Sequence, residues 1–417
     1  MSRIVTVREH ESLASSGLDA VETSELAEFA RDVLKQPNGD LAASKFVGMV
    51  TTRKGTALEI LPKIDLDHEA DDLNERTRQV FLEMLRSWRR TPKQLPESDI
   101  RSLSRFPMLE VFVRQFLILL TTLIRGGLAR RYINVEENLP YLRGRLLFDD
   151  HLRRNASNRA RFYTSHDELS VNRPANRLIH AALHMLAPRI RDATNQQLLR
   201  QSLIALAEVP PSHNPLADWR SHNIDRSMSH YQAVMQWVRL IVFQRGLATF
   251  SGSNTNLSLL FPMEQVFEDF LVASFRRHQQ HYGVVSQGLR KSMATIDDQA
   301  VFSTQPDIAL RAGSKTRFIL DAKWKEIDAT TQDLKHGITQ SDVYQLHAYA
   351  ARYGCSAVAL VYPRNAKFES TLRYRFFDGP ALLAVPFDVT QPQESVRRTI
   401  EALRGSLPNS ASAATAA

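Results

Sequence analysis

The 417-residue sequence has little of what marks a secreted or membrane protein. Its single cysteine, Cys355, cannot form an internal disulfide, and the Cys and His spacings of structural zinc sites are absent. We interpret Cys355 as a core thiol, because the apolar run 357–361 lies beside it. The first ten residues contain no uninterrupted apolar segment like that of a secretory signal, and the most apolar run, 116–124, is too short to cross a bilayer. We expect a cytoplasmic protein with no membrane partner.

Nucleotide-binding and hydrolase motifs are also missing. The sequence has no Walker-A motif, no Gly-x-Gly-x-x-Gly between a strand and a helix, and no Ser-His-Asp signature. The chain is therefore not expected to hydrolyse a nucleotide by itself.

Positive charge, by contrast, is in excess, with a formal net charge of +8 that favours a polyanionic partner. The segment 125–161 holds nine Arg, no Lys and four acidic residues. Arginine is suited to bidentate phosphate contacts, but a solvated face that makes ion pairs with other parts of the chain has the same composition. Composition leaves both interpretations open.

Residues 305–324 predict a β-hairpin that carries charge where a core strand normally has none. Alternation along 318–324 puts Asp321 and Lys323 on one face of the second strand. Counting outward from a turn at 312–315 sets Asp307, on the first strand, within about one residue of a position opposite Asp321. Two carboxylates and an ammonium group should therefore lie close together.

Carboxylates held that close repel each other unless a cation lies between them. The donor set consists of oxygens, so Asp307 and Asp321 predict a Mg²⁺ site, with Mn²⁺ as an acceptable substitute. Water at such a site can attack a phosphodiester, and Lys323 can orient the water or offset charge on the phosphate. The alternative is a structural ion pair between Asp321 and Lys323 at a sheet edge.

Two predicted helices flank the hairpin. The segment 261–271 has apolar residues at helical spacing, with Glu264 and Glu268 one turn apart beside this stripe. A second helix, for which we expect Ser341 as the N-cap, places Gln345 and Tyr349 one turn apart on one face.

The order of these elements resembles that of the PD-(D/E)xK nuclease superfamily, and the Gln-x-x-x-Tyr helix looks like its RecB-type branch. More of the chain is similar to the McrC-like nuclease subunits of McrBC-type modification-dependent restriction systems. The segments that carry the resemblance are Phe46-Val47-Gly48, Leu58-Glu59-Ile60-Leu61-Pro62-Lys63-Ile64, Leu142-Arg143-Gly144-Arg145-Leu146, Phe267-Glu268, Pro306-Asp307, Asp321-Ala322-Lys323 and Tyr344-Gln345-Leu346-His347-Ala348-Tyr349.

The resemblance implies a role for each site residue. Metal would be bound by Glu268, Asp307 and Asp321, and Glu268 is preferred to Glu264 because Phe267-Glu268 is closer to the family spelling. Lys323 would position the attacking water or stabilise the charge of the transition state. The scissile strand or the lysine would be held by Gln345 and Tyr349.

We expect a multidomain α+β fold. A small β-rich domain at 1–70 would bind the partner, and a helical middle region would follow at 71–250, interrupted by a strand-like segment at 144–148. A turn-rich linker, 251–256, would open an α/β PD-(D/E)xK nuclease-like domain with a mixed sheet at 251–408. Residues 409–417 have the composition of a disordered tail.

The function implied is that of a Mg²⁺-dependent DNA endonuclease subunit of a 5-methylcytosine-type restriction system. It would cut methylated DNA when activated by a separate McrB-like AAA+ GTPase. One alternative is a stand-alone RecB-like repair or recombination nuclease. Another is a non-catalytic scaffold that stimulates a partner NTPase, although the intact Asp307, Asp321 and Lys323 argue against it.

Overall fold

The computed structural model describes residues 3–29, 34–35, 42–43, 45–52, 54–66, 73–88, 104–222, 226–243, 258–377 and 379–407. The expected linker at 251–256 and the expected tail at 409–417 lie outside these residues. The chain divides into two compact units. One consists mainly of 107–249, and the other combines 3–106 with 260–417. Among the described helices, none is both long and apolar enough to cross a membrane.

The second unit begins with a four-stranded sheet of order β1-β5-β4-β9. Strand β5 pairs in parallel with β1 and antiparallel with β4. Alternating apolar residues of these strands build a small core, which includes Val5, Leu58 and Ile60. Helix α2 (Leu73–Ser87) packs on β5 and on α10 (Met263–His278). The other elements here are β1 (Ile4–Arg8), η1 (Leu13–Ser16), α1 (Ala20–Phe29), β2 (Leu34–Lys35), β3 (Ala42–Ala43), β4 (Phe46–Thr51), β5 (Ala57–Leu61) and β9 (Ser258–Pro262).

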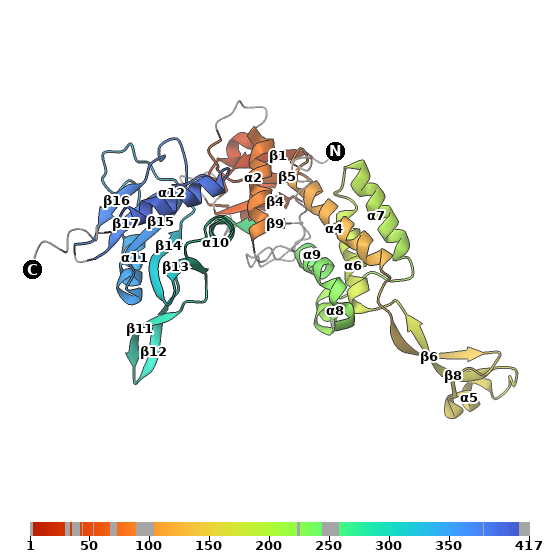
Figure 1. Ribbon diagram of the computed structural model, residues 1–417. Helices are drawn as coiled ribbons and strands as arrows, with labels where there is room; N and C mark the ends of the chain where they lie inside the picture. The colour runs from red at the N-terminus through yellow and green to blue at the C-terminus, as the bar shows by residue number, and fades with distance from the viewer. Residues whose placement is uncertain are drawn as a thin grey trace, which may run out of the picture. The chain divides into compact units, whose positions relative to one another are not determined.

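A six-stranded sheet forms the rest of this unit, in the order β10-β13-β14-β15-β17-β16. Strands β14, β15 and β17 run parallel, whereas β10, β13 and β16 join antiparallel, which confirms the expected mixed sheet. The hairpin of β11 and β12 projects from it (Figure 1). The strands are β10 (Gly283–Val285), β11 (Lys291–Ile296), β12 (Gln299–Thr304), β13 (Ile308–Ala312), β14 (Lys315–Ala322), β15 (Ala357–Pro363), β16 (Leu372–Arg375) and β17 (Ala381–Phe387).

Helices cover both faces of the six-stranded sheet. On one face, α10 packs beside α12 (Pro392–Arg404), and Phe267 of α10 meets Trp324 edge-on with ring centroids 5.3 Å apart. On the other face, α11 (Gln340–Tyr353) buries Leu346 and Tyr349 in a cluster that includes Ile319. Ile319 and Asp321 of β14 therefore face α11, and Trp324 faces α10, in agreement with the alternation read from the sequence.

A β-bulge sets the register of the β13–β14 hairpin. Near the turn, Ala312 pairs with Lys315 and Arg311 with Thr316, but beyond the bulge Leu310 pairs with Phe318 and Ile308 with Leu320. The residue skipped on β14 is Arg317, whose carbonyl accepts a hydrogen bond from Ser356 N (2.8 Å). One extra residue on one strand changes which side chains face each other.

The first unit is mostly helical. Its polar contacts include a partly buried ion pair between Arg114 and Asp192 and a buried hydrogen bond of 2.7 Å from Asn195 Nδ2 to Glu110 Oε2. The helices are α4 (Met108–Arg125), α6 (Pro174–Leu186), α7 (Ala193–Ala205), α8 (Pro215–Ser221), η4 (Arg226–Tyr231) and α9 (Gln232–Val242).

A three-stranded sheet of order β6-β8-β7 extends from these helices and carries the short helix α5 (Phe148–Asn155) (Figure 1). Strands β6 (Arg131–Leu139) and β8 (Phe162–Ser170) pair antiparallel along nine residues. The sequence predicted only the interruption at 144–148, where the structure has the two-residue strand β7 (Arg145–Leu146). The longer strands were missed because their residues are exposed or half-buried for the most part, so no apolar alternation reveals them.

Candidate functional site

The bulge places Asp307 directly opposite Asp321. Since Ile308 pairs with Leu320, the residue before β13 faces the penultimate residue of β14. Asp321 is 2% exposed, and Asp307 Oδ2 accepts a hydrogen bond of 2.8 Å from Ala322 N. The predicted juxtaposition of the two acids is confirmed. Without the bulge, Asp307 would face Leu320 instead.

Both acids are poorly suited to carry charge without a cation. Burial, together with the negative charges of Asp321 and Glu268, raises the pKa of Asp307 to about 8. Burial also raises the pKa of Asp321, although Lys323 pulls it in the opposite direction. A carboxylic acid that holds its proton at neutral pH in this way is a group that a metal ion would deprotonate.

Lys323 lies among three side-chain oxygens. Its Nζ is 2.7 Å from Asp321 Oδ2, 3.4 Å from Asp342 Oδ1 and 3.2 Å from Gln345 Oε1. Burial alone would lower the pKa of Lys323, but the carboxylates of Asp321 and Asp342 outweigh it and the pKa is raised. The ion pair considered as the alternative is thus present, and Asp307 adds a half-buried acid that this pair does not neutralise.

The sequence interpretation missed Asp342. Its carboxylate lies between Lys323 and Lys325, with Lys325 Nζ 3.2 Å from Oδ2. Thr339, not the expected Ser341, caps α11, and its hydroxyl both accepts from the Asp342 amide and donates to the Asp342 carboxylate. Burial would raise the pKa of Asp342, but these hydrogen bonds and the two lysines lower it. A signal was available in Thr-x-x-Asp, which has the spacing of a capping box.

Gln345 and Tyr349 lie one turn apart on α11, as predicted, and connect the lysine to the first strand of the hairpin. Gln345 accepts from Lys323 and donates from Nε2 to the Tyr349 hydroxyl (2.9 Å). That hydroxyl donates to the backbone carbonyl of Gln305 (3.1 Å), and burial raises its pKa. The chain of hydrogen bonds therefore fixes the Lys323 head group relative to the strand that leads into Asp307.

The two candidate glutamates have different surroundings. Glu268 contributes negative charge at Asp307 and accepts a hydrogen bond of 3.0 Å from Gln287 Nε2. Glu264 is exposed and lies 3.9 Å from the ammonium group of Lys45. The environment of Asp307 therefore favours Glu268.

The predicted metal ligands have the right chemistry but not a closed geometry. Asp307, Asp321 and Glu268 offer oxygen donors only, which suits Mg²⁺. Their donor atoms do not all lie within 4.8 Å of one another; of the residues described, the group that meets this limit is Glu137, His166 and Glu168 in the other unit. The excess of acid at half-buried Asp307 and buried Asp321 fits a divalent cation that would draw the ligands together.

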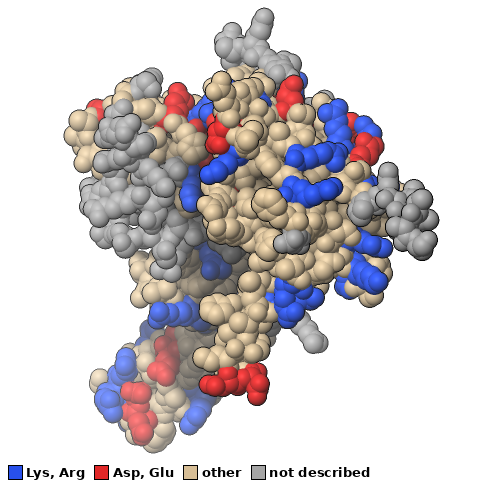
Figure 2. All heavy atoms as spheres, turned by 90° about the vertical axis from the view of Figure 1, so that its left-hand side faces the viewer, with Lys and Arg blue, Asp and Glu red and all other residues tan. Residues whose placement is uncertain are grey.

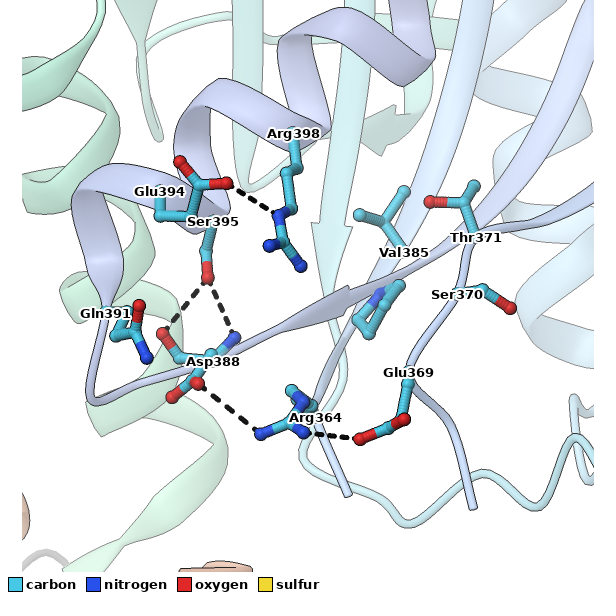
Figure 3. A pocket seen from close by; sticks show the side chains of 11 residues that line it. Arg364, Glu369, Ser370, Thr371, Val385, Asp388, Gln391, Glu394, Ser395 and Arg398 are labelled. Carbon is cyan, nitrogen blue, oxygen red and sulfur yellow. Dashed lines mark hydrogen bonds and ion pairs between the residues drawn. The ribbon is translucent and has the colours of Figure 1, made fainter. Parts of the chain in front are cut away.

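A pocket of about 540 Å³ lies elsewhere, where β15 and β17 end (Figure 3). Arg364 follows β15 and pairs with Glu369 and with Asp388, which follows β17. Arg398 pairs with Glu394 at 2.7 Å. Because these charges pair with one another and none of the predicted site residues lines the pocket, we assign it no role.

Basic residues are spread over the face of the molecule that Figure 2 draws. Figure 2 shows Lys and Arg scattered in small groups over the face drawn, without one continuous stripe. The charge on this face alone therefore does not indicate a path for a nucleic acid.

Comparisons with known proteins find a matching family and similar folds. The family model of the McrBC 5-methylcytosine restriction system component matches residues 41–363. Among solved structures, the chain is similar to one in the refined half-complex from the tetradecameric assembly of Thermococcus gammatolerans McrB AAA+ hexamers with bound McrC. That match has 17% identity and a TM-score of 0.72, and it covers 96% of this chain and 100% of that chain.

A second similar chain is in the cryo-EM structure of the Thermococcus gammatolerans McrBC complex. It has 19% identity and a TM-score of 0.51, and the match covers 67% of this chain and 89% of that chain. A comparison with curated proteins gives no match. The structural matches establish the likeness of fold, and the family model covers more than half of the sequence. The resemblance read from the sequence is confirmed: the chain belongs to the family of McrBC 5-methylcytosine restriction system components.

Proposed function

We propose that this chain is the Mg²⁺-dependent endonuclease subunit of a restriction system that cuts methylated DNA. The observation that carries the proposal is the pair of facing acids, buried Asp321 and half-buried Asp307, with a lysine beside one of them. A core ion pair needs one acid for one base, whereas here Asp307 adds an acid whose pKa of about 8 reflects burial and repulsion from its neighbours. Perturbed acids of this kind are typical of functional sites.

Asp307, Asp321 and Glu268 would hold the metal ion. When bound, Mg²⁺ would supply positive charge to the phosphate and make water a better nucleophile at neutral pH. The ammonium group of Lys323, fixed by Asp321, Asp342 and Gln345, would orient that water or offset charge on the phosphate. Tyr349 would act as a positioning residue because it holds Gln345.

The partner would be an McrB-like AAA+ GTPase. In the similar solved structures, McrC is bound to McrB AAA+ hexamers, and the family model names the 5-methylcytosine restriction system. We extend that partnership to this chain, together with methylated DNA as the substrate. The sequence contains no Walker-A motif, so the partner would hydrolyse the nucleotide.

The test compares wild-type protein with Asp307→Asn, Asp321→Asn and Lys323→Ala, each mixed with the McrB-like protein, GTP and Mg²⁺. Asp297→Asn, in the exposed β11–β12 hairpin, is the matched control. We expect wild type and control to cut methylated plasmid, whereas the three variants leave it intact but still stimulate GTP hydrolysis.

Other outcomes would favour the alternatives. Cutting without the GTPase, on methylated and unmethylated plasmid alike, would identify a stand-alone RecB-like nuclease. Stimulation of GTP hydrolysis by every protein, with no cutting by any, would identify a scaffold. Undiminished cutting by Asp307→Asn and Asp321→Asn would place the chemistry elsewhere.

A further inference from the structure

The small sheet β6-β8-β7 has an unusually polar interior. Every residue from 131 to 170 is described, and Tyr163 is the hydrophobic side chain in this stretch that is buried. The other buried residues are Asn155, Thr164 and His166. An element with so little apolar burial needs another source of stability, which in small folds is commonly a disulfide or a metal ion.

The polar residues of this interior differ in whether their polar atoms have hydrogen-bond partners. Asn155 exchanges two hydrogen bonds with Asn138, at 2.9 and 3.0 Å. His166 is 6% exposed, and neither of its ring nitrogens has a hydrogen-bond partner among the described residues. The hydroxyl of Thr164 is likewise buried without such a partner. Buried polar groups without partners are rare, because each carries an uncompensated desolvation cost.

Strand register brings two glutamates to the same face as His166. His166 pairs with Val135, Thr164 with Glu137, and Glu168 with Ile133, so alternation places Glu137, His166 and Glu168 on one side of the sheet. A donor atom of each lies within 4.8 Å of a donor atom of the other two, and His166 Nε2 is 3.9 Å from Glu137 Oε1. That distance is too long for a hydrogen bond, and a metal ion can lie between the two atoms.

The segment before β7 presses against this histidine. Gly144 has a φ of +70°, and a Cβ atom built on it would lie 2.4 Å from Ser165 O and 2.7 Å from His166 Cβ. A residue other than glycine would force the two segments apart. The close approach encloses His166 from one side, while Glu168, which is exposed, leaves the cluster open to water.

We propose that Glu137, His166 and Glu168 form a binding site for a transition metal ion of the Zn²⁺ class. Imidazole and carboxylate donors suit Zn²⁺ better than Mg²⁺, and three protein ligands with a water in the fourth position are a common zinc arrangement. The ion would connect β6 to β8 and give His166 the partner that it lacks. This site is separate from the acids of the β13–β14 hairpin, which offer no imidazole.

The experiment measures zinc binding by the full-length protein. After treatment with a chelator, the protein is dialysed against micromolar free Zn²⁺ or Mg²⁺, and its metal content and thermal midpoint are determined. The variants are Glu168→Gln and His166→Gln, and Asp167→Asn is the matched control because Asp167 points to the opposite face of β8.

We expect wild type and Asp167→Asn to hold one zinc ion in this site and to melt at a higher temperature in Zn²⁺ than in Mg²⁺. Glu168→Gln should weaken zinc binding at least about 10-fold and abolish the zinc-dependent rise in thermal midpoint. Even substitutions of residues that only contact the metal ligands typically lower metal affinity about 10–100-fold. If His166→Gln does not fold, Glu168→Gln still tests the site, because Glu168 is exposed and its replacement should not disturb folding. Equal zinc binding by all four proteins would overturn the proposal. A fifth variant, Asp321→Asn, tests the other acidic site, and the proposal would also be overturned if this variant alone lost zinc.

Discussion

Trp324 Nε1 donates a hydrogen bond of 2.8 Å to Glu9 Oε2, although 315 positions separate the two residues in the chain. Glu9 is 2% exposed, and its burial raises its pKa against the pull of this hydrogen bond. Trp324 directly follows Lys323, and its ring also packs on Phe267, the residue before Glu268. The N-terminal sheet is therefore connected to the end of β14, which leads into Lys323, and to α10, which carries Glu268.

Removing this hydrogen bond should destabilise the protein. Trp324→Phe keeps an aromatic ring but removes the only donor of the indole, so we expect the free energy of unfolding to fall by about 1–3 kcal/mol. Denaturant unfolding measures this change, with Tyr132→Phe, a substitution of an exposed ring, as the control. An unchanged midpoint would mean that Glu9 is satisfied by other groups.

The metal-free protein should lose stability as the pH rises towards 8. The pKa of Asp307 is raised from 3.8 to about 8 by burial and neighbouring acids, so between these values the folded state holds a proton that the unfolded chain has released. Stability then falls by up to about 1.4 kcal/mol per pH unit across that window, and this contribution stops changing above pH 8.

Asp307→Asn removes this proton linkage, and its amide oxygen can still accept from Ala322 N. Thermal midpoints of the metal-free proteins between pH 5 and 9 should therefore change less in the variant than in wild type. Mg²⁺ should raise the wild-type midpoint more at pH 8.5 than at pH 6, because a ligand must be deprotonated. Parallel curves for the two proteins would show that Asp307 is already ionised at pH 5.

Asp321 has a second role that Asp307 does not share, because it is paired with Lys323 at 2.7 Å. Asp321→Asn should lower the thermal midpoint of the metal-free protein. The loss in free energy of unfolding should be less than the about 3–5 kcal/mol typical of a broken buried pair, since Asp342 still faces the lysine. Asp307→Asn should leave the midpoint unchanged or raise it. If both variants behave alike in thermal unfolding, the ion pair does not contribute to stability.

Tyr349→Phe tests the positioning role of the tyrosine. The substitution removes the hydroxyl that accepts a hydrogen bond from Gln345 Nε2 and donates one to the Gln305 carbonyl. A hydrogen bond of this kind contributes about 1 kcal/mol to stability. We expect a several-fold lower rate constant for DNA cleavage with DNA affinity unchanged, whereas Gln345→Ala should be more harmful because Gln345 contacts Lys323 directly. A change in affinity with an unchanged rate constant would mean that Tyr349 contacts the DNA.

The elements that carry the candidate site could be predicted from the sequence because they are local. The hairpin and the four-residue spacing of Gln345 and Tyr349 each follow from a known period, and the structure places Asp321 on β14, Asp307 just before β13 and Lys323 just after β14. The alignment of Asp307 with Asp321 was predictable only to within one residue, because the bulge at Arg317 leaves no mark in an apolar pattern.

Contacts between distant segments were not predictable. Asp342 was missed because its relation to Lys323 depends on how α11 lies across the sheet, and the bond between Trp324 and Glu9 depends on how two sheets pack. Strands β6 and β8 were missed for the opposite reason: they bury so few apolar residues that they have no periodic signal. His166 looked like any other scattered histidine until strand pairing placed Glu137 and Glu168 beside it.

The bulge in the β13–β14 hairpin also determines where this chain tolerates a change of length. Extra residues inserted at Gly313 and Ser314 would enlarge the loop and leave the pairing of Ile308 with Leu320 intact. A single residue inserted between Phe318 and Asp321 would instead turn Asp321 and Lys323 to the opposite face of the sheet and move Asp321 away from its position opposite Asp307. The loop is therefore a place to insert a fluorophore or an affinity tag for assembly studies, whereas the four residues after the bulge have a fixed length.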